Sequence, residues 1–108
     1  MKKIMQLIEN FNTERDWHQF HTPANLAKSI VIEAGELLEL FQWQEDPKSM
    51  SDLKVELADV LSYALMLASH YQLDLEQILE DKIAKNALKY PVDKAKGKAD
   101  KYDEFTQE

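Results

Sequence analysis

The sequence predicts an all-α protein, and three observations support that prediction. Only two glycines and three prolines interrupt 108 residues, so few positions break a helix. Leu, Ala, Glu, Lys and Gln, which favour helices, are abundant throughout the chain. Apolar residues recur at the three- and four-residue spacing that places them on one helix face. Four helices joined by short connections favour a four-helix bundle-like protomer.

The first two helices have recognisable limits. The first is expected from about Lys2 to Trp17. The second begins after Thr22, a good N-cap, with Pro23 at its first position, where the missing N–H costs no hydrogen bond. It is expected to continue to about Gln44 and to end before the next proline. The apolar face of the first helix comprises Ile4, Leu7, Ile8 and Phe11.

The third helix begins near Ser49 or Ser51, either of which can cap it, and continues to about Tyr71. The second and third helices are apolar around most of their circumference. Such helices are normally buried on all sides, and the core of a single chain of 108 residues is too small to bury two of them. We therefore expect the protomer to assemble into a dimer or a tetramer.

The fourth helix is capped by Asp74, with Gln77 placed for a capping box, and it ends at Tyr90. The residues that follow are strongly charged and include a glycine. The prediction is therefore a helical domain over residues 1–91 and a charged C-terminal tail over residues 92–108.

Composition excludes several classes of function. A net charge of −7 disfavours nucleic-acid polymers and anionic membranes as partners. The absence of cysteine excludes disulfides, a thiol nucleophile and a cysteine-based zinc site. Two glycines are too few for a glycine-rich phosphate loop. No apolar stretch is long enough to span a bilayer and no targeting signal is visible, so we expect a cytoplasmic protein.

Two acidic pairs fall on the central helices. Glu33 lies within the apolar stripe of the second helix and Glu36 at its edge, and Glu56 and Asp59 lie beside the apolar arc of the third. Residues three apart are neighbours on a helix, so each pair presents two adjacent carboxylates. Four carboxylates in apolar surroundings repel one another unless a cation joins them, and an all-oxygen ligand set favours Mg²⁺ or Mn²⁺. Surface charge with salt bridges between helices is the alternative explanation.

Two further features have both a structural and a functional explanation. Lys82 and Asn86 lie four residues apart on the buried face of the fourth helix. A lysine there commonly extends its charge into solvent, but the pair can also bind an anion. The segment 15–21 concentrates aromatic and imidazole side chains around Trp17, and Trp43 closes the second helix. Such tryptophans often only cover a core, but they also suit base stacking.

The acidic pairs belong to a recognisable pattern. E-A-G-E at 33–36 and E-L-A-D at 56–59 resemble the metal motif of the MazG-type all-α nucleoside triphosphate pyrophosphohydrolases. The resemblance extends from about residue 11 to residue 102 and is closest to the dCTP pyrophosphatase branch of that family. The segments that resemble this branch are E-R-D-W-H-Q-F-H (14–21), G-E-L-L-E-L-F-Q-W (35–43), E-L-A-D-V-L-S-Y (56–63) and K-I-A-K-N-A-L-K-Y-P-V (82–92).

The resemblance implies Mg²⁺-dependent hydrolysis of a (deoxy)nucleoside triphosphate, dCTP or a modified dCTP, to the monophosphate and pyrophosphate, a house-cleaning of the nucleotide pool. It also implies paired subunits with pockets near their interface. The implied metal ligands are Glu33, Glu36, Glu56 and Asp59. The implied base pocket comprises Trp17, His21 and Trp43. The implied sugar and phosphate contacts are Tyr63, Lys82 and Asn86.

Some alternatives stay open at this point. Glu36 is our choice of catalytic base for the attacking water, although the sequence does not rank the four carboxylates. A di-iron carboxylate bundle requires a histidine three residues after a glutamate, which His18, His21 and His70 do not satisfy. A non-enzymatic helical interaction module that uses its acidic faces for recognition is the second hypothesis. The preferred base, the number of ions and the choice between dimer and tetramer are undecided.

Overall fold

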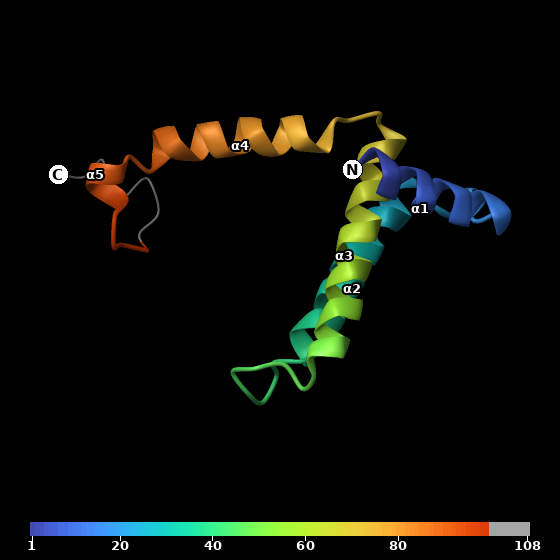
Figure 1. The fold of residues 1–108 in the computed structure, drawn as a ribbon, viewed down its shortest axis with the longest axis horizontal. Coiled ribbons are helices and arrows are strands. Elements are labelled where there is room, and N and C mark those ends of the chain that lie inside the picture. The colour runs from blue at the N-terminus through green and yellow to red at the C-terminus, as the bar shows by residue number, and fades with distance from the viewer. Residues whose placement is uncertain (100–108) are drawn as a thin grey trace. The chain divides into compact units, whose positions relative to one another are not determined.

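Residues 1–99 of the chain are described by a computed structural model, in which all regular structure is helical (Figure 1), so the all-α prediction is confirmed. The chain divides into two compact units, Met1–Leu73 and a second that begins at Asp74. None of the described helices has the length and apolar character needed to cross a membrane. The helices in chain order are α1 (Lys2–Glu14), the 3₁₀ turn η1 (His18–Phe20), α2 (Pro23–Glu39), α3 (Met50–His70), α4 (Leu75–Lys89) and α5 (Val92–Ala95).

The first unit is organised around a hairpin of α2 and α3, against which α1 packs through α3 (Figure 1). Its buried apolar residues are Leu26 of α2 and Leu65 and Ala68 of α3. Burial of such side chains is the main favourable contribution to folding. The hairpin therefore fixes the relative register of the two helices on which the acidic pairs were predicted.

The predicted helix starts are confirmed by their capping hydrogen bonds. Thr22 Oγ1 accepts a hydrogen bond from the backbone N–H of Asn25 at 3.2 Å, and Pro23 opens α2. Of the two candidate serines, Ser49 caps α3, because its Oγ accepts from the backbone N–H of Asp52 at 3.1 Å. Each cap supplies an acceptor for a backbone donor that the first turn leaves without a partner.

The helix ends differ from the prediction. Helix α1 ends at Glu14 rather than near Trp17, because Asp16 adopts a left-handed backbone conformation, with φ of 53°. The N–H of Trp17 then donates back to the carbonyl of Asn12 at 3.0 Å. Helix α2 ends at Glu39 rather than near residue 44, because its backbone changes to hydrogen bonds between residues three apart in the turn that follows.

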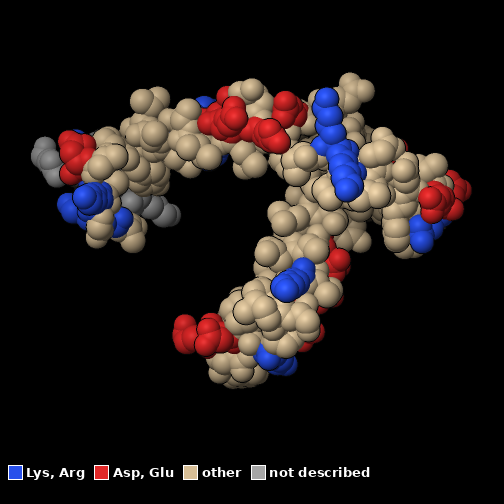
Figure 2. Space-filling model, in the orientation of Figure 1, with Lys and Arg blue, Asp and Glu red and all other residues tan. Residues whose placement is uncertain are grey.

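The second unit contains α4 and α5. Asp74 caps α4 as predicted, with Oδ1 accepting from the N–H of Gln77 at 3.2 Å. The expected capping box is incomplete, because the Gln77 side chain donates to Asp81 at 2.9 Å instead. Acidic side chains gather along α4 and lysines gather at α5 (Figure 2). Helix α5 lies within the predicted tail, of which residues 100–108 are outside the described part of the chain.

Candidate functional site

Three of the four predicted carboxylates form one cluster between α2 and α3. Glu33, Glu56 and Asp59 each offer an oxygen, and these oxygens lie within 4.8 Å of one another. All three side chains are partly buried. Glu36 is exposed and is not one of these three, but it lies close enough to Glu33 and Glu56 to act on the pKa of each. The two sequence pairs therefore converge in space, as predicted.

The electrostatics of this acidic cluster favour a bound cation. Burial, followed by the adjacent Glu36 carboxylate, raises the pKa of Glu33. Burial and the charge of Glu36 also raise the pKa of Glu56. One oxygen of each, Glu33 Oε2 and Glu56 Oε2, is enclosed with no hydrogen-bond partner among residues 1–99. Enclosed carboxylate oxygens without donors, in an all-oxygen set, fit a hard divalent cation.

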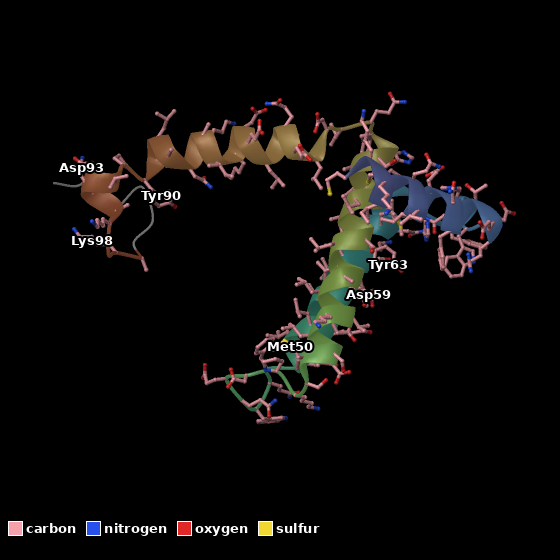
Figure 3. All side chains as sticks on the ribbon, in the orientation of Figure 1. Met50, Asp59, Tyr63, Tyr90, Asp93 and Lys98 are labelled. Carbon is pink, nitrogen blue, oxygen red and sulfur yellow. The ribbon has the colours of Figure 1, made fainter. Side chains whose placement is uncertain are left out.

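A pocket of about 420 Å³ adjoins the cluster and shares Asp59 with it. Its aromatic side combines Trp17, His21 and Tyr63, with ring centroids 6.4 Å apart for Trp17 and His21 and 6.3 Å apart for His21 and Tyr63. Asp59 and Tyr63 lie one turn apart on α3 (Figure 3). The residues that line this aromatic pocket are Leu7, Ile8, Phe11, Asn12, Trp17, His21, Asp59, Ser62, Tyr63 and Met66.

The segment after α1 holds Trp17 in place. The Trp17 ring packs edge-on against the Phe11 ring, with the two centroids 5.5 Å apart. The Arg15 guanidinium lies 3.7 Å above the centroid of the same Phe11 ring, and its Nη1 donates to the Phe11 carbonyl at 3.1 Å. Trp17 is 43% exposed, so one part of the ring is packed and the rest is available to a ligand.

The polar groups of the pocket favour their neutral forms. Burial, followed by the proximity of His18, lowers the pKa of His21. Burial and the charges of Glu33 and Asp59 raise the pKa of Tyr63. Neutral imidazole and phenol groups can both donate and accept a hydrogen bond. The pocket therefore joins a neutral aromatic end to an anionic end at the carboxylates.

Three of the six residues predicted to bind the substrate do not line this pocket. Trp43 is 85% exposed and lies in the loop between α2 and α3, at the end of the hairpin away from α1 (Figure 1). Lys82 and Asn86 belong to the second unit, where Lys82 is exposed and Asn86 is half-buried on α4. Their roles toward the base and the phosphates stay predictions.

The structure also adds pocket residues that the sequence interpretation missed. Phe11 was assigned to the apolar face of α1, and the structure makes that face a wall of the pocket. Asn12 was not identified, and Met66 was identified only as an apolar residue beside the acidic pair of the third helix. Asn12 lies four residues after Ile8 and hence on the same side of the helix, which is the signal that could have identified it.

The chain is similar to known proteins over most of its length. Residues 28–105 match the sequence model of the MazG-like family. A mouse protein named dCTP pyrophosphatase 1 is 42% identical over 94% of this chain, and the human protein of that name is 39% identical over 97%. The chain spans about two thirds of the length of these relatives, 65% of the mouse protein and 67% of the human one. A pyrophosphatase structure from Archaeoglobus fulgidus is 35% identical, with a TM-score of 0.79 over 84% of this chain and 92% of that one.

Proposed function

The chain belongs to the MazG-like family, and from this premise we propose that it is a nucleoside triphosphate pyrophosphohydrolase. The reaction splits the anhydride bond between the α- and β-phosphates of a deoxynucleoside triphosphate and yields the monophosphate and pyrophosphate. The observation that supports this most strongly is the acidic cluster of Glu33, Glu56 and Asp59 beside the aromatic pocket. A nucleoside triphosphate needs a cation site for its phosphates next to an aromatic surface for its base. The names of the relatives favour dCTP or a modified dCTP as the substrate.

We assign the metal ligands to Glu33, Glu36, Glu56 and Asp59, with Mg²⁺ as the cation and Mn²⁺ as a substitute. The enclosed oxygens of Glu33 and Glu56 support this assignment. When bound, the cation neutralises phosphate charge and lowers the pKa of bound water. The four carboxylates hold and orient it, and the apolar residues beside them limit the access of other water.

Glu36 is the proposed general base. It is the most exposed of the four carboxylates, yet it adjoins both Glu33 and Glu56. In the proposed step, a Glu36 carboxylate oxygen accepts the proton of the attacking water. Water oxygen bonds to phosphorus as the bond to the pyrophosphate oxygen breaks, so no covalent enzyme intermediate is needed.

Trp17 and His21 are the proposed base-binding residues of one chain, and Tyr63, which lines the same pocket as Asp59, is a proposed sugar or phosphate contact. Trp43 lies on a loop at the far end of the hairpin, so it reaches a base only in a pocket shared between subunits. Lys82 and Asn86 on α4 are the proposed phosphate and sugar contacts. A lysine there offsets phosphate charge.

We infer that the protein forms a homodimer or a homotetramer. Large apolar side chains are highly exposed in the single chain, among them Val31 and Leu38 of α2 at 71% and 69%, and Leu88 of α4 at 84%. Burying such side chains between copies removes apolar area from water. Light scattering coupled to size exclusion measures the mass directly.

One experiment separates the enzyme from the non-enzymatic interaction module. Purified protein is incubated with canonical and modified (d)NTPs, with Mg²⁺, Mn²⁺ or EDTA, and pyrophosphate release is measured. Metal-dependent release that is strongest with dCTP or a modified dCTP is expected. Absence of turnover with every nucleotide and both cations, together with no effect of Mg²⁺ on thermal stability, would leave the interaction module as the better explanation.

A further inference from the structure

Asn12 is a polar side chain enclosed at the edge of the aromatic pocket. It lies on α1 and is 2% exposed. Its Nδ2 donates a hydrogen bond to the Met66 sulfur at 3.6 Å. Its Oδ1 is buried and has no hydrogen-bond partner in the described part of the chain. A buried amide oxygen that accepts no hydrogen bond lowers the stability of the folded state, so we expect a donor to occupy the space beside it.

Met66 determines which end of the amide is available. A thioether sulfur accepts weak hydrogen bonds and donates none, so it can pair only with the amide nitrogen. The Asn12 side chain is therefore oriented with its nitrogen toward Met66 and its oxygen free to accept. The backbone of Asn12 is also fixed, because its carbonyl accepts from the N–H of Trp17 at 3.0 Å.

Asn12 lines two cavities, one of about 230 Å³ that it shares with His18 and Ser69, and the aromatic pocket, which is the one that adjoins the acidic cluster. Asn12 lines the pocket of about 420 Å³ together with Trp17, His21 and Tyr63, and pockets of roughly 300–1,000 Å³ suit small-molecule ligands. Asp59 marks the phosphate end of this pocket, so the aromatic residues mark its base end. Stacking on aromatic side chains accepts any base, whereas a hydrogen bond to the edge of the base distinguishes them.

We propose that Asn12 determines base specificity, with its Oδ1 accepting a hydrogen bond from the exocyclic amino group of the nucleobase. This inference rests on the proposed function. Cytosine offers such an N–H at its 4-position, whereas uracil and thymine present a carbonyl oxygen there, which would face the amide oxygen and repel it. Leaving the acceptor unpaired, or facing another acceptor, disfavours those bases.

The test compares kcat/KM for dCTP, dUTP and the deoxynucleotide of 2-pyrimidinone, which has hydrogen in place of the amino group. The wild-type protein prefers dCTP over both. The substitution Asn12→Leu keeps the branched shape of the side chain and removes the acceptor, so the dCTP preference falls about tenfold or more. Asn10→Leu on the exposed side of the same helix is the matched control and leaves the preference unchanged.

A second variant addresses the orientation of the amide and does not alter Asn12. Met66→Leu conserves volume but removes the sulfur, so the amide can turn and offer Nδ2 to a carbonyl base. The ratio of dCTP to dUTP turnover then falls, chiefly through faster dUTP turnover. This result would support the proposal even if Asn12→Leu failed to fold.

The outcomes are distinguishable from failure of the proposed function. No turnover by folded wild-type protein overturns the proposed function itself. Turnover with equal efficiency for the three substrates, or a dCTP preference that survives in both folded variants, overturns the role of Asn12. In the latter case the enclosed oxygen is satisfied by an ordered water instead of by the base.

Discussion

The two ends of the pocket are built in different ways. At the acidic end, every carboxylate comes from an α-helix, and the α2–α3 hairpin aligns the two pairs. At the aromatic end, Trp17 and His21 come from the segment around η1, and the remaining wall comes from α1 and α3. Regular geometry thus determines the position of the carboxylates, whereas loop geometry determines the position of Trp17 and His21, the residues proposed to bind the base.

Under the proposed function, this difference separates the residues that support the chemical step from those that select the nucleotide. Charge neutralisation for phosphoryl transfer requires a set of oxygens at fixed positions, which a pair of packed helices supplies. Base recognition depends on a few contacts that can change without disturbing that helical frame. Substitutions at the acidic end should abolish turnover of every nucleotide, and those at the aromatic end should change which nucleotide is preferred.

The largest expected effect follows from Glu56→Gln. It removes the negative charge of one proposed metal ligand from the acidic cluster while keeping the shape of the side chain. Loss of even an outer contact to a metal ligand commonly lowers affinity or activity by about 10–100-fold, so kcat/KM should fall by at least about a hundredfold for every nucleotide. Steady-state pyrophosphate release measures this. Glu36→Gln should lower kcat as severely while the protein still folds.

A matched control lies on α2. Glu39 is exposed and outside the acidic cluster, so Glu39→Gln should retain full activity. Calorimetry adds an independent measure, because Glu56→Gln removes repulsion in the metal-free protein and should not lower its melting temperature. A Glu56→Gln protein with wild-type activity would show that Glu56 is not a metal ligand.

A smaller and more selective effect is expected at the aromatic end. Trp17→Ala removes a stacking surface whose loss costs about 1–3 kcal/mol per base. KM for dCTP should therefore rise by about tenfold or more, with a smaller change in kcat. Phe20→Ala is the control, because Phe20 is a 60% exposed aromatic on the neighbouring turn and does not line the pocket. Equal KM changes in the two variants would contradict the assignment of the base end.

The acidic cluster should also make the stability of the folded protein depend on pH. The pKa values of Glu33 and Glu56 are raised above 4.5 in the folded protein, so the folded state binds more protons than the unfolded state in the range just above that value. Stability of the metal-free protein therefore falls as pH rises through this range. The proposed binding of Mg²⁺ to the deprotonated cluster opposes the fall. Melting temperatures measured from pH 4.5 to 7, with and without Mg²⁺, should diverge as pH rises.

The lowered pKa of His21 acts in the opposite direction below its ordinary value of 6.5, so the contribution of the acidic cluster is read from the difference between the wild type and Glu56→Gln. A parallel series on Glu56→Gln should have a shallower slope without metal and a smaller separation with it. If the wild type and the variant give the same two curves, groups elsewhere in the chain determine the pH response.

The sequence predicted that carboxylates of the two central helices come together, and it predicted the lining of the aromatic pocket only in part. Helical periodicity alone placed Glu33 and Glu56 toward the same core. This is possible because the face of a helix on which a residue lies depends only on its spacing along the sequence. The position of Asn12 in the pocket depends on the left-handed turn at Asp16 and on a long-range contact with Met66. Neither can be predicted from the periodicity of the sequence. Trp43 was grouped with Trp17 by family resemblance, and the single chain keeps it on a separate loop.

The smallest expected effect is at Gly35, which lies between the two carboxylates of α2. A Cβ added there meets no atom within 4 Å in the described chain, and glycine inside a helix is less favourable than alanine by about 1 kcal/mol. Gly35→Ala should therefore stabilise the protein by up to about 1 kcal/mol, measured by chemical denaturation, and leave the acidic cluster intact. Destabilisation would indicate instead that a second subunit packs closely against this face of α2, and a lower mass in light scattering would identify that contact.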